Sequence, residues 1–147
     1  MKVLWVSMNA ALYDAKKGDL YGGIGWIGAL YNQLKEHKNN EVELGIVSVY
    51  DHDFKEEIDE VTYYGIKSQK PSGFKKWLYY INGYKNIHHL DLFSEISSVI
   101  NDFKPDLIHL WGVENRLASV IHCKDIPVVA HLQGLLSLSI YIYYPYG

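Results

Sequence analysis

The fold of this chain is decided by residues 2–34, which begin Lys2-Val-Leu-Trp-Val-Ser-Met8 and end Gly22-Gly-Ile-Gly-Trp-Ile-Gly-Ala-Leu-Tyr-Asn-Gln-Leu34. The first run is rich in β-branched and aromatic residues, which is typical of a buried parallel strand. In the second run, apolar residues recur at spacings of three and four, which predicts a helix with one face on the sheet. A long stretch of mostly polar or small residues connects the two elements.

The glycine pair Gly22-Gly23 lies where the polar stretch meets the helical pattern. A helix N-terminus presents unpaired N–H groups and a partial positive charge, and residues without a Cβ let an anion approach the backbone closely. The sequence therefore predicts that Gly22 and Gly23 open a helix and contact a phosphate group.

The same region satisfies the dinucleotide-binding pattern as Gly23-x-Gly25-x-x-Gly28, and Asp51 ends the next strand, where a ribose-binding acid belongs. In a dinucleotide fold, however, the glycines form the tight turn directly after the first strand. Here a long loop intervenes, so Gly25 and Gly28 are expected inside the helix. There they would allow close packing on the sheet, and Asp51 would be a solvated turn residue.

Length and composition set further bounds. The chain has 147 residues, of which 48% are hydrophobic, and this is enough for one domain with a core. A net charge of −3 and the lack of any groove-reading module exclude nucleic acid as the main partner. The single cysteine, Cys123, excludes an intrachain disulfide, and an N-terminus that enters a strand directly leaves no room for a signal peptide. The expected compartment is the cytosol.

Strand and helix patterns alternate along the rest of the chain. Residues 43–50 predict a second strand, residues 51–59 an acidic loop and residues 60–65 a short third strand. Asp91 is a suitable helix cap, and the apolar stripe that follows is closed by Lys104-Pro105. Further elements are a strand over 106–111, a short helix over 114–124 and a strand over 127–132. This order predicts an α/β, Rossmann-like parallel sheet with helices on both faces and ligands at the carboxyl ends of its strands.

Three motifs together resemble a known family: Lys104-Pro-Asp-Leu-Ile-His-Leu-Trp-Gly112, Pro127-Val-Val-Ala-His-Leu-Gln-Gly134 and the late Gly22-Gly-Ile-Gly25 before a helix. In order and spacing they look like the N-terminal, acceptor-side domain of retaining glycosyltransferases of family 4. Those enzymes have the two-domain B-type fold, and the resemblance covers most of this chain. It implies hexosyl transfer from a nucleotide-sugar donor to a glycan or lipid-linked acceptor, with retention at the anomeric carbon.

The resemblance also implies roles for individual residues. Gly22 and Gly23 match the loop that contacts the donor diphosphate, and His131 matches the catalytic histidine near the transferred sugar. Residues expected to line the acceptor side or the cleft are Trp111, Gly112, Gln133 and Gly134. No metal and no cofactor other than the donor substrate is expected.

The resemblance further implies that residues 1–147 are one Rossmann-like domain of a longer enzyme. The family's donor-nucleotide pocket lies in a second, C-terminal domain that has no counterpart here, and residues 135–147 contain no obvious completed element. The chain is therefore interpreted as a truncated piece that is inactive in isolation.

The segment from Lys67 to Lys85 has a different composition, in which lysines interleave with aromatic residues such as Phe74, Trp77 and Tyr80. This pattern suits peripheral contact with an anionic membrane or a lipid-linked acceptor, at the inner face of the membrane. A solvated loop that packs its aromatic rings on the domain is an equal alternative. No run of roughly 18 apolar residues, the length that a membrane-spanning helix needs, occurs in the sequence.

Three function classes remain open. The leading one is the sugar-nucleotide-dependent transferase, the second an NAD(P)-dependent oxidoreductase using Gly23, Gly25, Gly28 and Asp51, and the third a noncatalytic nucleotide-binding module. His109 lies inside a strand, where a structural histidine is more common than a catalytic one. Zinc-protease, P-loop and α/β-hydrolase motifs do not occur.

Overall fold

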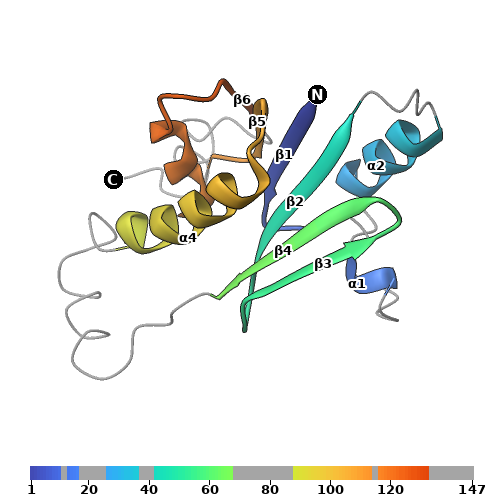
Figure 1. The fold of residues 1–147 in the computed structure, drawn as a ribbon, viewed down its shortest axis with the longest axis horizontal. Coiled ribbons are helices and arrows are strands. Elements are labelled where there is room, and N and C mark those ends of the chain that lie inside the picture. Colours follow the sequence, from blue (N-terminus) through green and yellow to red (C-terminus); the bar gives the residue numbers. More distant parts are fainter. Residues whose placement is uncertain (11–12, 17–25, 37–41, 68–87, 114–115, 133–147) are drawn as a thin grey trace, which may run out of the picture.

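The fold is a six-stranded sheet with helices packed on both of its faces (Figure 1). The computed structural model describes residues 1–10, 13–16, 26–36, 42–67, 88–113 and 116–132. The elements are β1 (Lys2–Ser7), α1 (Tyr13–Lys16), α2 (Trp26–Glu36), β2 (Glu43–Tyr50), β3 (Phe54–Ile58), β4 (Val61–Lys67), α4 (His88–Phe103), β5 (Leu107–Trp111), the 3-10 helix η2 (Arg116–His122) and β6 (Val128–His131). None of the described helices is long and apolar enough to cross a membrane.

The strand order is β3-β4-β2-β1-β5-β6, and every neighbouring pair is parallel except β3 and β4. The α/β, Rossmann-like fold is thus confirmed, but the sheet is mixed, and the prediction of a loop over residues 51–59 is wrong. Along β3, half-buried Phe54 and Ile58 alternate with exposed Lys55 and Glu57. Because a charged, period-two segment suits the edge of a sheet, these residues pair with β4 through a two-residue turn.

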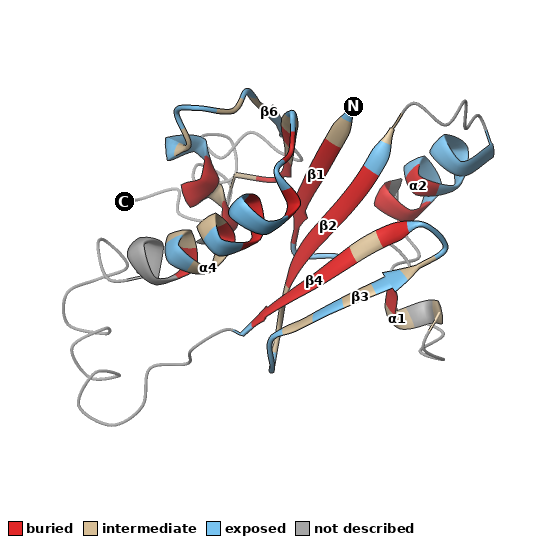
Figure 2. Ribbon diagram, viewed as in Figure 1, coloured by how far each residue is buried: buried red, intermediate tan, exposed pale blue. Residues whose placement is uncertain are grey.

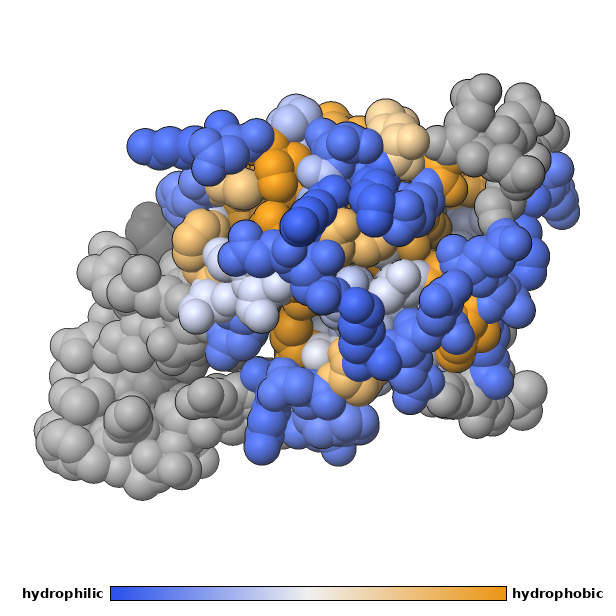
Figure 3. Space-filling view, in the orientation of Figure 1, coloured by the Kyte–Doolittle hydropathy of each residue, from blue (hydrophilic) through white to orange (hydrophobic). Residues whose placement is uncertain are grey.

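Buried strands at the centre of the sheet separate two hydrophobic clusters (Figure 2). Alternate residues of β1 point to opposite faces, so Leu4 and Val6 pack under α4, whereas Val3 and Trp5 belong to the cluster under α1 and α2. The prediction of helices on both faces is therefore confirmed. On the side of α4, the outward surface is mostly hydrophilic, which fits a helix that buries one stripe only (Figure 3).

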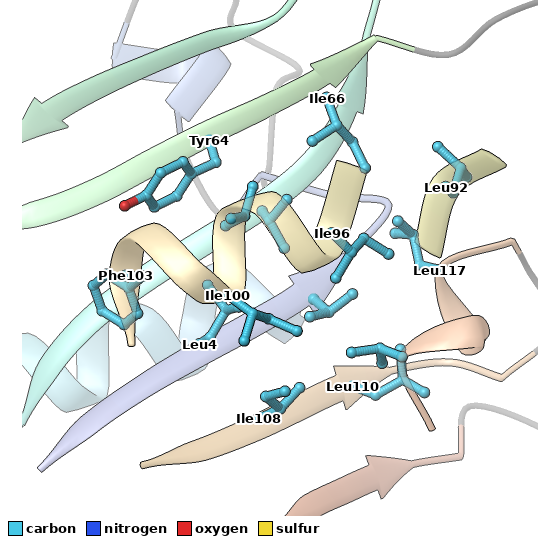
Figure 4. Packing of buried hydrophobic residues seen from close by; sticks show 14 residues of the cluster. Leu4, Tyr64, Ile66, Leu92, Ile96, Ile100, Phe103, Ile108, Leu110 and Leu117 are labelled. Carbon is cyan, nitrogen blue, oxygen red and sulfur yellow. The ribbon is translucent and has the colours of Figure 1, made fainter. Parts of the chain in front are cut away.

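Helix α4 supplies most of the cluster on its face of the sheet. Figure 4 shows Ile96, Ile100 and Phe103 pointing from the helix toward the strands, where Leu4 and Ile108 are fully buried. Of the apolar stripe predicted after Asp91, Phe93 is partly exposed, and the other members are buried: Leu92, Ile96, Val99, Ile100 and Phe103. The predicted cap is wrong, because α4 begins at His88 and Asp91 lies inside it. The helix therefore extends further toward its N-terminus than the predicted cap.

The C-terminus of α4 carries a residue in the left-handed conformation. Lys104 has a φ of 54°, and its N–H donates to the carbonyl oxygen of Ile100 at 2.8 Å. This αL position is usually glycine, because a Cβ is strained there. Pro105 then prevents the helix from continuing.

We expect Lys104→Gly to stabilise the chain by about 1 kcal/mol, because it removes the strain at positive φ. The measurement is the free energy of unfolding in urea. Ser94→Gly is the matched control: Ser94 is exposed within the same helix, where glycine should destabilise by about 0.5 kcal/mol. A loss of stability in both variants would contradict the role of Lys104 as an αL cap.

Candidate functional site

The candidate site lies at the carboxyl edge of the sheet, beside the central strand β1. The chain passes from β1 through α2 to β2 on one face, and from β4 through α4 to β5 on the other face. The strand order therefore reverses between β1 and β5, and ligands of open α/β sheets bind at such switch points. The register pairs Ser7 of β1 with Trp111 of β5, and Trp111 with His131 of β6.

His131 is the last residue of β6 and is exposed at this edge. Its ring stacks on the indole of Trp111, with centroids 5.0 Å apart and planes 27° apart. Trp111 is only 2% exposed and meets Trp5 edge to face at 5.1 Å. Trp111 therefore provides a buried aromatic surface against which the ring of His131 packs. The predicted contact of Trp111 with an acceptor remains a prediction.

Gly112 ties the ends of β5 and β6 together. Its N–H donates to the carbonyl oxygen of His131 at 2.9 Å, and its φ is 86°. A side chain would strain this backbone conformation, so the position requires glycine. Across the switch point, buried Ser7 accepts a hydrogen bond through Oγ from the N–H of Asn9 at 3.0 Å, which turns the chain away from β1.

His109 lies two residues before the end of β5 and is half-buried. Burial lowers the pKa of its imidazole, and the nearby His131 lowers this pKa further. The ring of His109 stacks on Trp111 with centroids 4.0 Å apart. Its position in the interior of a strand was predictable, but its stacking was not, because residue spacing does not fix ring planes.

The structure thus brings together Trp111, Gly112 and His131. The other predicted site residues, Gly22, Gly23, Gln133 and Gly134, lie outside the described residues, as does Gly25. Gly28 lies within α2, as expected. Asp51 follows β2 and is exposed, and a hydrogen bond from His52 lowers the pKa of its carboxyl group. Of the basic aromatic segment, only Lys67, the last residue of β4, is described.

The short helix α1 lies inside the predicted loop and was not predicted from the sequence, nor were its contacts with α2, β2 and the β3–β4 turn. We call this set of contacts the clamp. Lys16 Nζ donates to Tyr31 Oη of α2 at 2.8 Å and pairs with Asp59 at 3.1 Å. Tyr50 Oη donates to Asp14 at 2.8 Å. Because Lys16 and Tyr31 stand on either side of residues 17–25, their contact brings the two flanks of this segment together.

We expect the Asp59 side of this clamp to depend on pH. Hydrogen bonds from Lys16 and Lys35 lower the pKa of the Asp59 carboxyl below its ordinary value. A carboxyl whose pKa is lower in the folded chain stabilises the fold above its unfolded pKa, and this contribution disappears as the pH falls through the folded pKa. Asp59→Asn should therefore destabilise the chain at neutral pH and have no effect at strongly acidic pH.

Urea unfolding at neutral pH and at the lowest pH that keeps the chain folded checks this expectation. Glu57→Gln removes one negative charge from the same β3–β4 hairpin and corrects for the change in net charge. An equal loss of stability for Asp59→Asn at both pH values would mean that the ion pairs do not contribute.

Comparison of the chain with known protein families, with curated proteins and with solved structures found no match. Among the described residues, no three histidine, cysteine or acidic side chains gather closely enough to hold a metal ion. The residues of this edge offer an exposed imidazole that stacks on a buried indole beside the switch point.

Proposed function

We propose that this chain is the acceptor-side domain of a retaining glycosyltransferase that uses a nucleotide-sugar donor. The observation that carries the proposal is the exposed imidazole of His131, which is held on Trp111 at the carboxyl edge beside the switch point. The resemblance of the motifs that contain Trp111, Gly112 and His131 to family 4 points to the same edge. The acceptor is a glycan or a lipid-linked sugar.

In this proposal His131 hydrogen-bonds the transferred sugar or charge that develops on it in the transition state. The acceptor hydroxyl attacks the face of the anomeric carbon from which the phosphate departs, and the departing phosphate assists as base. Gly22 and Gly23 contact the donor diphosphate. The nucleobase and ribose are held by a second domain, so this chain supplies one wall of the cleft.

A second candidate, an NAD(P)-dependent oxidoreductase, draws support from the exposed carboxylate of Asp51 directly after β2. The connection between β1 and α2 argues against it. A dinucleotide fingerprint needs a tight glycine turn between the first strand and helix, whereas residues 8–25 separate β1 from α2 and include α1. A noncatalytic nucleotide-binding module is compatible with the fold alone.

Calorimetric titration of the 147-residue chain with NAD and with a panel of nucleotide sugars separates these functions. A half-site built from a few backbone donors, each contributing on the order of 1 kcal/mol, should bind a nucleotide sugar no more tightly than the millimolar range. NAD should show no binding. Micromolar binding of NAD would overturn the glycosyltransferase proposal, because a complete dinucleotide site would then be present in this domain.

A further inference from the structure

The indole of Trp111, on which the ring of His131 stacks, is itself stacked on a second histidine, His109. We propose that His109 is a positioning residue, which fixes the plane of Trp111 and through it the orientation of the His131 ring. The purpose of this orientation rests on the proposed function. The stacking of the rings is independent of that function, because it consists of contacts among residues of β1, β5 and β6.

Three rings form a continuous stack along this face of the sheet. His109 and Trp111 have centroids 4.0 Å apart and planes 26° apart, and Trp111 and His131 have centroids 5.0 Å apart and planes 27° apart. Trp5 meets both His109 and Trp111 edge to face, with interplanar angles of 83° and 72°. Because Trp111 is buried and contacts Trp5, His109 and His131, a tilt of its indole would disturb the stacked ring of His109.

His109 is not placed to act on a ligand that His131 reaches. In the register it pairs with Trp5 and Val129, two residues before the carboxyl edge, and its ring centroid is 6.3 Å from that of His131. Burial, and to a smaller extent the nearby His131, lowers the pKa of its imidazole, which favours the neutral form of the ring. A neutral imidazole can pack face to face with an indole without burying a charge.

His131 needs such support because of where it lies. It is the exposed last residue of β6, which lies at the edge of the described sheet, and an exposed side chain can change rotamer more easily than a buried one. A hydrogen bond from an imidazole is directional, and displacement of a catalytic group by about 1 Å can lower a rate on the order of 100-fold. Stacking on a fixed indole restricts the ring to one plane before any ligand binds.

The ring protons of His131 report this stacking directly, because the ring current of Trp111 shifts their NMR signals. In the 147-residue chain, His109→Val removes the ring behind Trp111, and we expect the His131 signals to move toward those of an unstacked histidine. His109→Phe keeps a planar ring at the same place and should preserve the shifts of the parent. His122→Ala, an exposed histidine on η2, should leave them unchanged.

Unchanged His131 signals in folded His109→Val would overturn the positioning role. If that variant does not fold, His109→Leu, which fills more of the same volume, replaces it. Shifted His131 signals in that variant would support the positioning role, and unchanged signals would overturn it. In the complete enzyme, His109→Val should lower kcat on the order of tenfold with little change in KM, and His109→Phe should restore it. If no variant or parent transfers sugar, the proposed function fails, while the NMR comparison still decides the role of His109.

Discussion

Replacement of Gly65 by alanine should destabilise the chain by about 2–4 kcal/mol, which is the largest loss of stability that we expect from adding one methyl group. Gly65 of β4 pairs directly with Phe54 of β3, and the Phe54 ring covers the place that a Cβ would occupy. That ring is itself stacked on Tyr13 and packed edge to face on Tyr50, with centroids 4.9 Å away in both cases. A methyl group at Gly65 must displace Phe54 and break both contacts.

Urea denaturation of the single variants and of the double variant tests this reasoning. In a Phe54→Leu background the ring is already absent, so Gly65→Ala should cost less than half as much as it does in the parent chain. A cost that is the same in both backgrounds would show that the strain comes from the β4 backbone and not from the ring of Phe54.

The same pair of strands shows why part of the fold could not be predicted. The run Phe54–Ile58 has two apolar residues among charged ones, and its strand character depends on pairing with β4. The hairpin turn places Asp59 and Glu60 at φ of 51° and 65° without a glycine, so the usual turn signal is missing. Helix α1 has only four residues, too few for a periodic pattern, and its tertiary contacts hold it.

Elements that bury a continuous apolar run or stripe were predicted within a few residues. The predicted strand over 43–50 has the bounds of β2, and the predicted helix ends with α4 at Phe103. The spacing of apolar residues in such an element follows from which of its side chains are buried, so it can be read from the sequence. The meeting of Trp111 and His131 also followed from sequence, because the carboxyl ends of neighbouring parallel strands lie at one edge. The stack with His109 and the clamp at Lys16 depend on ring planes and long-range contacts, which spacing does not specify.

In the complete glycosyltransferase that we propose, His131→Ala should lower kcat by roughly 30- to 1000-fold, which corresponds to about 2–4 kcal/mol of lost transition-state stabilisation. The alanine removes the exposed hydrogen-bonding group but leaves Trp111 anchored by Trp5 and His109. The free energy of unfolding should therefore change by less than about 1 kcal/mol, because an exposed ring at a strand end contributes little to the core.

Steady-state transfer kinetics with the parent, His131→Ala and His131→Asn check this expectation. Asparagine keeps a side-chain donor near the same position and should recover part of kcat, whereas His122→Ala removes an exposed histidine of η2 and should behave as the parent. A normal kcat in His131→Ala would reject the role of this imidazole in the reaction. A parallel loss of kcat and of folding stability would instead assign His131 to the packing of the β5–β6 edge, because an interaction made only in the transition state changes the rate without changing the fold.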